Sequence, residues 1–456
     1  MIINAFDNVE IRADGHKYAR RDIAEGENII KYGLPIGHAT CAIKVGEHVH
    51  IHNVKTNLGD VLEYRYEPDA AAIAAFDAKR RNDGATFRAY RHADGRIGIR
   101  NDLWVVPLVG CVNRLAERLA QAVGGLALTH PYGCSQMGED HEMTANLLAA
   151  FVRHPNAGGV LVVALGCENN TLESFKVRLG ECSKLNVRFL KAQDPGDEYQ
   201  KGLELLAELD AARPKDRVEV PVSELVVGLK CGGSDGFSGL TANPLVGRFS
   251  DWLALRGGST ILTEVPEMFG AETLLMKRCR TRNVFEKCVK MINDFKDYYT
   301  AHNQVCYENP SLGNKAGGIT TLEDKSLGCV QKGGSSPVED VLLYGDHVRS
   351  HGLSLMTGPG NDLVASTVLA AAGAHLILFT TGRGTPFGCV VPTLKIASND
   401  TLATNKPNWI DWNAMSNPDV EPFAAKVLRV ASGEEWAKNE INGSQNIAIF
   451  KDGVTL

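Results

Sequence analysis

Residues 103–111 of the chain read LWVVPLVGC, an apolar run that ends in a cysteine. Three further runs have this form: LALTHPYGC at 126–134, VLVVALGC at 160–167 and LVVGLKC at 225–231. Each run is followed by polar, turn-prone residues and then by a helical pattern, the order expected of parallel strands with covering helices. The carboxyl ends of parallel strands meet at one edge of a sheet, where ligands bind. We therefore expect the four terminal cysteines to lie together in a cofactor site or reactive centre. They are Cys111, Cys134, Cys167 and Cys231.

The alternation of strand and helix patterns runs from residue 87 toward the C-terminus and predicts an α/β fold with two Rossmann-like domains, at 87–215 and 216–456. The predicted strands are 103–109, 159–165, 225–229, 260–265, 353–356 and 375–380. The predicted helices are 112–123, 171–180, 243–256, 267–299 and 362–372. Residues 306–336 are rich in glycine and serine and are expected to form loops.

The first 62 residues have a different pattern. Short apolar pieces are broken by glycines, and CAIKVGEHVHIHN alternates apolar and polar residues with a period of two. This pattern is typical of a small β module. Residues 63–86 mix alanine with charged residues and are expected to form a linker with some helical character.

Composition excludes several classes of protein. Of the 456 residues, 44% are hydrophobic and 22% charged, and the net charge is −6 with lysine and arginine dispersed, so nothing favours nucleic-acid binding. No apolar stretch approaches the roughly 20 residues of a membrane span. The N-terminal segment lacks the apolar core of a secretory signal. We expect a cytoplasmic protein whose 11 cysteines are thiols or metal ligands.

The segment GEHVHIHN at 46–53 places three histidines at alternate positions. On a strand, His48, His50 and His52 would share one face, about 7 Å apart, and His16 in the turn DGHK is positioned in sequence to join them. Neighbouring imidazoles suit a metal site or a proton relay. The alternative is an exposed strand face that is rich in histidine.

The residues after the cysteines offer further chemistry. Glu168 and Asp235 follow predicted strands, where a carboxylate can ligate a divalent ion or act as a general base. The turns CGGSDGFSG at 231–239 and TGRGTP at 381–386, with Arg383, can bind a carboxylate or phosphate through backbone N–H groups. Neither turn fits the dinucleotide or P-loop fingerprint.

Taken together, these segments resemble the altronate/galactarate dehydratase family over nearly the whole chain. The resemblance is carried by IKYGLPIGHA, GEHVHIHN, HPYGCSQMGEDH, VRHPNAGGVLVVALGCENN, CGGSDGFSGLTANP, LTEVPEMFGAE, ENPSLGNKAGGITTLEDKSLG, TTGRGTPFG and AIFKDGVTL. It implies an N-terminal SAF (β-clip) module followed by two α/β domains. It also implies dehydration of a sugar acid, D-altronate to 2-dehydro-3-deoxy-D-gluconate, dependent on Fe²⁺ or Mn²⁺. HVHIHN and GCENN are similar to the altronate rather than the galactarate branch.

Such a dehydration removes a proton from C2 and hydroxide from C3, so it needs a Lewis acid, a base, an acid and a carboxylate clamp. The expected metal ligands are His16, His48, Cys134, Cys167 and Cys231. The expected catalytic residues are His50, Glu168, Asp235 and Lys315, the last in a loop at 313–318 that closes over the site. The expected substrate-binding residues are Gly232, Gly233, Ser234, Asn243, Arg383 and Thr385.

Several alternatives stay open at this stage. The iron is held either as a mononuclear Fe²⁺ or Mn²⁺ site of histidine and carboxylate, or as an iron–sulfur cluster on the four strand-end cysteines. The reaction is either altronate dehydration, dehydration of galactarate or another hexonate, or sulfite loss from a sulfolactate. A non-catalytic sugar-acid sensor is the rival from another class. The expected partners are a small-molecule sugar acid and a second copy of the chain in a dimer, with no nucleic acid and no membrane.

Overall fold

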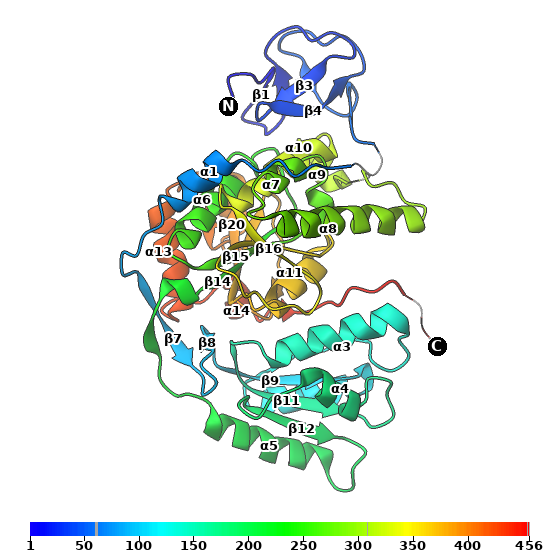
Figure 1. The fold of residues 1–456 in the computed structure, drawn as a ribbon, viewed down its shortest axis with the longest axis vertical. Helices are drawn as coiled ribbons and strands as arrows, with labels where there is room; N and C mark the ends of the chain where they lie inside the picture. Colours follow the sequence, from blue (N-terminus) through cyan, green and yellow to red (C-terminus); the bar gives the residue numbers. More distant parts are fainter. Residues whose placement is uncertain (60–62, 308, 454, 456) are drawn as a thin grey trace.

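The computed structural model describes residues 1–59, 63–307, 309–453 and 455. It is an α/β structure in which a small β module, a large C-terminal α/β domain and a smaller α/β domain follow one another along the long axis (Figure 1). The predicted end of the N-terminal module, after residue 62, falls beside residues 60–62, which lie outside the described part. No helix among the described residues has the length and apolar character needed to cross a membrane.

The N-terminal module consists of two three-stranded antiparallel sheets, with strand orders β1-β2-β5 and β3-β4-β6. Its strands are β1 (Val9–Ile11), β2 (Lys17–Ala19), β3 (Asn28–Lys31), β4 (Leu34–Ala39), β5 (His48–Val49) and β6 (Val54–Lys55). Alternate residues such as Val9, Ile11 and Ile36 face its core. The expected histidine strand over 48–52 is wrong, because β5 ends at Val49 and a turn closed by Asn53 follows.

The linker contains one helix, α1 (Ala70–Asp77), which begins at the N-cap residue Asp69. It leads to a three-stranded antiparallel sheet with the order β13-β7-β8. These strands are β7 (Thr86–Arg91), β8 (Ile97–Gly98) and β13 (Val218–Pro221). Strands β7 and β8 come before the smaller α/β domain in the sequence and β13 comes after it. Their pairing brings the two ends of that domain together.

The smaller domain is a parallel sheet of four strands, in the order β10-β9-β11-β12. Its strands are β9 (Asp102–Pro107), β10 (Leu126–Ala127), β11 (Ala157–Ala164) and β12 (Val187–Lys191), and its helices are α2 (Asn113–Ala122), α3 (Gly138–Val152), α4 (Leu172–Leu179) and α5 (Glu198–Ala212). The whole of β11 is buried, as its continuous apolar sequence predicts. The run LALTHPYGC forms a strand only at its first two residues, and the remainder is a loop.

The C-terminal domain is built on a seven-stranded parallel sheet in the order β16-β17-β15-β14-β18-β20-β21. The strands are β14 (Val226–Cys231), β15 (Ser259–Leu262), β16 (Val338–Leu342), β17 (Gly352–Met356), β18 (Leu376–Thr381), β20 (Thr393–Ala397) and β21 (Trp412–Asn413). The helices are α6 (Ala242–Ala254), α7 (Glu272–Met276), α8 (Arg282–Ala301), α9 (Leu312–Ala316), α10 (Leu322–Cys329), α11 (Asp362–Ala371), α12 (Asp400–Asn405), α13 (Val420–Ala431) and α14 (Lys438–Ile441). A short pair, β19 (Gly388–Cys389) with β22 (Gln445–Asn446), lies beside it. The loop expected at 306–336 is wrong, because α9 and α10 occupy much of it.

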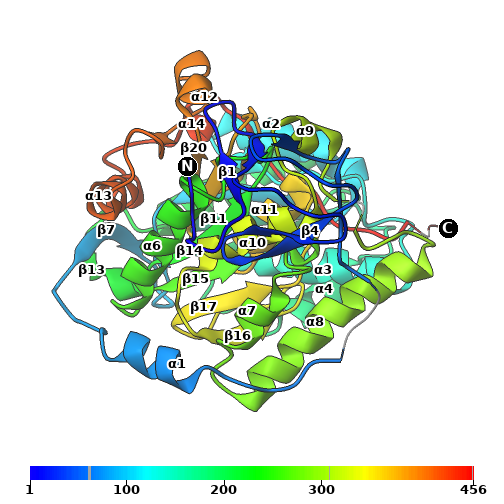
Figure 2. The same cartoon turned by 90° about the horizontal axis from the view of Figure 1, so that it is seen from above.

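The two smaller bodies pack at opposite ends of this sheet. The N-terminal module covers the carboxyl ends of its strands, where Gly15 contacts Gly236 after β14 (Figures 1 and 2). The smaller domain packs at the amino ends, where His375 before β18 bonds to the carbonyl of Ile97. The expectation that four thiols meet at one edge is therefore wrong, since Cys231 ends a strand of a different sheet from the other three.

Candidate functional site

The junction between the N-terminal module and the C-terminal domain is formed by glycines that let two backbones touch. A Cβ at Gly236 would lie 1.9 Å from the carbonyl oxygen of Gly15, and one at Gly318 would lie 2.3 Å from the same oxygen. The Gly15 turn is thus inserted between the loop after β14 and the segment after α9. His16, the next residue, lies at this junction. Its Cα would be 3.5 Å from a Cβ placed on Gly318.

A buried triad of charged residues also connects the N-terminal module to the C-terminal domain. Asp324 of α10 accepts hydrogen bonds from Lys17 at 2.6 Å and Lys31 at 2.8 Å, and all three side chains are at most 2% exposed. Burial alone would raise the pKa of Asp324, but the two ammonium groups hold it well below its ordinary value. Both lysines come from strands of the N-terminal module, so the triad joins the two bodies across a buried contact.

The histidines of the module converge at this junction. The ring centroid of His16 lies 5.1 Å from that of His48 and 5.7 Å from that of His50, and the last two are 5.3 Å apart. His16 Nδ1 and His48 Nε2 are 3.1 Å apart. Burial lowers the pKa of His50 to about 4, helped by Lys17 and His48, and it also lowers that of His48. The rings of His48 and His50 are therefore neutral near pH 7 and offer lone pairs to a metal or a proton. His52 is exposed.

The loop after β14 meets the loops after β18 and β20 at a buried carboxylate. Asp235 accepts hydrogen bonds from Ser238 and Ser398 at 2.8 Å and from Asn399 at 2.9 Å. The backbone N–H of Arg383 donates to Gly233 at 3.0 Å, which brings the two predicted glycine turns together. Ser398 and Asn399 were not predicted from the sequence, where Ser-Asn after a strand is an unremarkable turn.

Helix α9 lies beside this meeting of loops. Asn314 donates to the carbonyl of Ser234 at 2.9 Å, and the guanidinium of Arg383 donates to the carbonyl of Gly313 at 3.3 Å. The half-buried Lys315 is carried by the same helix. Most of the predicted flexible loop at 313–318 is therefore a short helix, which packs against these loops.

A second charged cluster lies beneath these loops. Lys230 forms ion pairs with Glu264 and, at 3.0 Å, with Asp362, and Lys325 pairs with Glu267 at 2.7 Å. Glu264 has a left-handed backbone (φ 73°), a strained conformation for a residue that is not glycine. Burial and Glu267 raise the pKa of Glu264. The position of Glu264 at the end of a strand is visible in the sequence, but its buried partners Lys230 and Glu267 are not, because isolated lysines and glutamates usually lie on the surface.

Cys231 belongs to this buried cluster rather than to the histidines. Its Sγ lies 3.4 Å from Cys329 Sγ and 3.0 Å from a carboxylate oxygen of Glu267. Among the described residues, this trio is the group whose possible metal-ligand atoms all lie within 4.8 Å of one another. The hydrogen bond to Cys231 and burial raise the pKa of Cys329 well above its ordinary value, so its thiol is protonated.

Several predicted residues lie away from the junction. Cys134, Cys167 and Glu168 belong to the smaller domain, and the Glu168 carboxylate accepts from its own turn at Leu165 and Gly166. The structure does not bring these three to His16 and His48. Asn243, by contrast, lines the same small cavity as Asp235 and Lys31, where it donates to the carbonyl of Gly328 and accepts from Thr380. Thr385 Oγ1 accepts from the N–H of Phe387. Gly232, Gly233 and Ser234 lie in the loop that carries Asp235.

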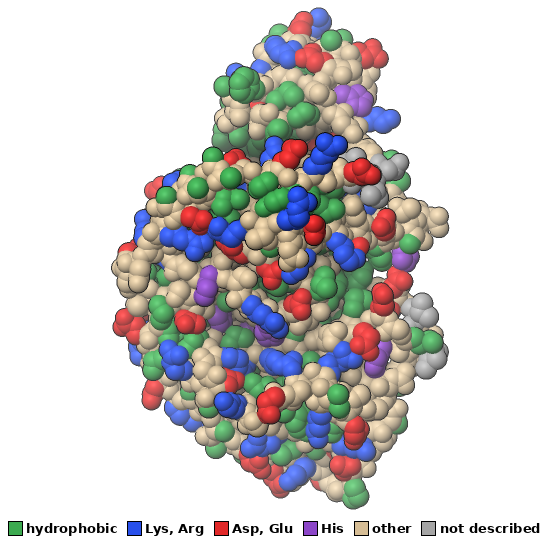
Figure 3. All heavy atoms as spheres, in the orientation of Figure 1, with side chains coloured by type: hydrophobic (Ala, Val, Ile, Leu, Met, Phe, Trp, Pro, Cys, Tyr) green, Lys and Arg blue, Asp and Glu red, His purple; other side chains and the backbone are tan. Residues whose placement is uncertain are grey.

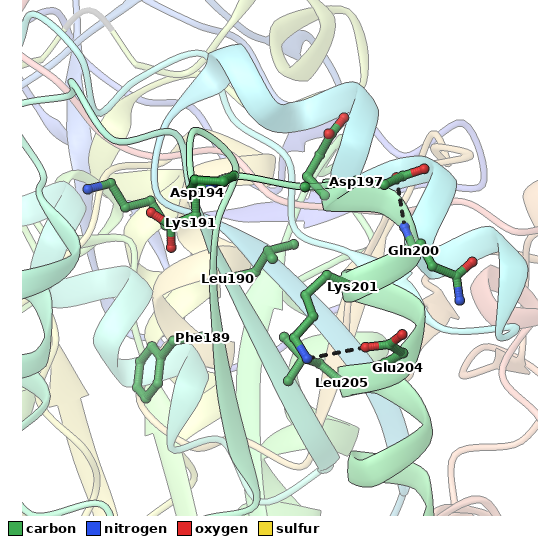
Figure 4. A pocket seen from close by; sticks show the side chains of 12 residues that line it. Phe189, Leu190, Lys191, Asp194, Asp197, Gln200, Lys201, Glu204 and Leu205 are labelled. Atoms are coloured by element: carbon green, nitrogen blue, oxygen red, sulfur yellow. Dashed lines mark hydrogen bonds and ion pairs between the residues drawn. The ribbon is translucent and has the colours of Figure 1, made fainter.

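One surface hollow lies in the smaller domain, away from the junction. A hollow of about 500 Å³ between β12 and α5 is lined by Asp194, Asp197, Lys201 and Glu204, and the last two pair with each other (Figure 4). Lys191 points away from that pair. Basic and acidic side chains are interspersed over the face shown in Figure 3.

Replacing Gly236 with alanine tests the junction. The new Cβ would overlap the Gly15 carbonyl, so the module must shift at a cost of about 1–3 kcal/mol. We expect the activity of this site to fall at least tenfold while circular dichroism is unchanged. Gly59→Ala is the matched control, since a Cβ there meets nothing within 4 Å. Equal activity of the two variants would show that the junction is not part of the site.

Comparison with known proteins assigns all three bodies of the chain. Residues 3–57 match the altronate/galactarate dehydratase SAF domain, residues 89–212 the second domain of D-galactarate dehydratase/altronate hydrolase, and residues 222–455 the C-terminal D-galactarate/altronate dehydratase model. Altronate dehydratase of Bacillus subtilis is 52% identical over 98% of this chain and 94% of its own. Altronate dehydratase of Escherichia coli is 51% identical over 97% and 92%. Galactarate dehydratase (L-threo-forming) of Escherichia coli is 31% identical over 97% and 90%.

Proposed function

The chain belongs to the D-galactarate/altronate dehydratase family, and on that premise we propose that it is a hydro-lyase that converts D-altronate to 2-dehydro-3-deoxy-D-gluconate. The observation that carries the proposal is the convergence of His16, His48 and His50 with the loops of Asp235 and Arg383 at one junction. The identity of about half to the altronate enzymes, against 31% to the galactarate enzyme, supports altronate over galactarate.

We propose that His16 and His48 hold an Fe²⁺ or Mn²⁺ ion. The residues present fit such an ion: the two ring nitrogens face each other at 3.1 Å, and the buried Nδ1 of His50 beside them has no hydrogen-bond partner among the described residues. Imidazole is a suitable ligand for both metals. The Cys231 trio fits less well, because Lys325 already neutralises Glu267 and Lys230 and Lys332 lie close by.

The ion, when bound, supplies Lewis-acid stabilisation of the negative charge that develops on the substrate carboxylate and 2-hydroxyl. His50 accepts the C2 proton, since its neutral form prevails near pH 7. Lys315 donates a proton to the departing C3 hydroxyl, and the resulting enol becomes the 2-keto acid. Arg383 binds the substrate carboxylate, and Asp235 fixes the loops that position it.

A substrate screen tests this function directly. The purified chain is incubated with Fe²⁺ or Mn²⁺ and with D-altronate, galactarate, other hexonates or sulfolactate, and products are identified by mass and by a keto-acid assay. We expect altronate to be turned over with the highest kcat/KM and to lose one water. Sulfite release from sulfolactate without altronate turnover would contradict the proposal. Altronate binding without turnover would identify a sensor.

Arg383→Gln is expected to weaken substrate binding. An ionic hydrogen bond to a carboxylate contributes about 1.5–3 kcal/mol, so kcat/KM should fall roughly 10- to 100-fold, mainly through KM. Arg248→Gln is the control, because this exposed arginine contacts only the carbonyl of Pro418 among the contacts observed. An unchanged KM in Arg383→Gln would remove this residue from the site.

Three coarser expectations are kept as proposals. The two parallel sheets, the larger with α6 and α11 on opposite faces, support two Rossmann-like domains at 87–215 and 216–456. They follow the β module at 1–62 and the linker at 63–86. Exposed thiols such as Cys111 support a reducing, cytoplasmic location. We also propose a homodimer. Light scattering would determine its mass, and limited proteolysis within 63–86 would test the division.

A further inference from the structure

The three strand-end cysteines of the smaller domain share a pattern that the proposed function does not use. Each is preceded by glycine and followed, after one residue, by a carboxamide. The three segments are Gly110-Cys111-Val112-Asn113, Gly133-Cys134-Ser135-Gln136 and Gly166-Cys167-Glu168-Asn169. Cys231 departs from the pattern, with lysine before it and two glycines after it. The same motif therefore occurs three times within one domain.

The fold brings the three segments together. They follow β9, β10 and β11, which are adjacent parallel strands, so all three emerge at the same edge of the sheet. The N–H of Gly110 donates to the carbonyl of Tyr132 at 2.9 Å, and that of Asn169 donates to the carbonyl of Cys134 at 3.4 Å. The loop that holds Cys134 is thus bonded to the loops that hold the other two thiols.

The thiols at this edge are exposed, which is unusual for cysteine. Cys111, Cys134 and Cys167 are all on the surface, and among the described residues Cys41 is the other exposed cysteine. The carboxamides beside them are incompletely satisfied: the buried Nε2 of Gln136 and Oδ1 of Asn113 have no hydrogen-bond partner in the described structure. Gln136 is 4% exposed, so its free N–H₂ group is oriented by the protein rather than by solvent.

We propose that these three cysteines bind an iron–sulfur cluster of the [4Fe–4S] type and leave its fourth iron open to an oxygen ligand, water or a hydroxy acid. Thiolates around one ion lie within about 4 Å of each other, because metal–sulfur bonds are about 2.3 Å. Among the described residues, Cys111, Cys134 and Cys167 do not form a group as close as a single ion requires. A cluster of several irons can join thiolates that lie farther apart. Three thiolates suffice for three irons, and Cys231 lies on the other sheet.

The surrounding groups suit a cluster. Side-chain N–H donors near the sulfides tune a cluster's potential, and Gln136 Nε2 is free to donate. Gln193 Nε2 already donates to Cys167 Sγ at 3.6 Å. A nearby positive charge stabilises a thiolate. Lys191 can supply this charge, because its Cε would lie 2.8 Å from a Cβ placed on Gly166, the residue before Cys167. The cluster would lie at the opposite end of the C-terminal domain from the histidines, so this inference does not rest on the proposed function.

The experiment is anaerobic purification of the full chain, followed by iron and acid-labile sulfide analysis, visible absorption and electron paramagnetic resonance after reduction by dithionite. We expect about four irons and four sulfides per chain. Cys111→Ser, Cys134→Ser and Cys167→Ser should each lose most of the sulfide with unchanged circular dichroism. Cys41→Ser, the exposed control, should retain it.

Wild-type protein without labile sulfide after anaerobic purification and reconstitution with iron and sulfide would overturn the inference. Serine variants that keep the full sulfide content would also overturn it. Altronate turnover is measured on the same samples. Turnover by sulfide-free, Mn²⁺-loaded protein would leave the proposed function intact while the cluster fails. A cluster in a protein that does not turn over altronate would support the cluster and contradict the proposed function.

Discussion

Asp324→Asn is expected to release the N-terminal module from the C-terminal domain and to abolish altronate turnover. The substitution leaves Lys17 and Lys31 without a counter-charge in a contact where their side chains are at most 2% exposed. Removing one partner of a buried ion pair costs about 3–5 kcal/mol, which is a large fraction of the stability of a domain contact. The pKa of Asp324 is held low, so the carboxylate remains charged across the physiological range.

Limited proteolysis within residues 63–69 and a thermal melt measure this release. Asp22→Asn is the matched control, since Asp22 pairs with Lys44 in the same module but both side chains are at least 60% exposed. Such surface pairs contribute about 0–1 kcal/mol. If Asp324→Asn behaved like Asp22→Asn, the ion triad would not hold the junction together.

His50→Gln is expected to lower kcat for altronate by roughly 10²- to 10⁴-fold, the usual contribution of a positioned general base. Glutamine keeps a polar group near the same place but cannot accept a proton near pH 7. Because we assign the metal to His16 and His48, the affinity for Mn²⁺ should change little. Steady-state kinetics with saturating Mn²⁺ and a Mn²⁺ titration separate the two effects.

His38→Gln serves as the control for this variant. His38 lies in the same module, on β4, but its Nδ1 bonds to Asn57 instead of the histidine cluster. We expect it to keep nearly full activity. A His50→Gln enzyme with wild-type kcat would exclude His50 as the base, and a loss of Mn²⁺ binding would make it a metal ligand instead.

Much of the fold follows from local sequence. Continuous apolar runs of strand length followed by amphipathic segments located β9, β11, β14, β17 and β18 and the helices after them. Strand β20 contains Lys395 and β16 contains Glu339 and Asp340, so neither shows a clear apolar run. Helix α10 is buried on all sides, including Asp324 and Lys325, because its charges find partners only in the folded protein. No local pattern predicts such a helix.

The sequence predicts individual motifs of the site better than it predicts which residues contact one another there. The histidine segment, the two glycine turns and Lys315 all lie at one junction, as chemically conspicuous residues often do. The ion triad was not predicted, because it depends on partners that lie up to 307 residues apart in the sequence. The four cysteines show the limit of reasoning from strand ends. A sequence indicates that a strand ends in a thiol but does not tell which sheet the strand joins.

The most direct test of the account is pulsed electron paramagnetic resonance of Mn²⁺ bound to the full chain, with histidine nitrogen as the reporter. The account predicts couplings from two imidazole nitrogens, lost in His16→Gln and His48→Gln and retained in Cys231→Ser, and a change in the spectrum when D-altronate is added. Mn²⁺ that shows no histidine coupling, or that binds unchanged in the two histidine variants, would contradict the assignment of the active site to this junction.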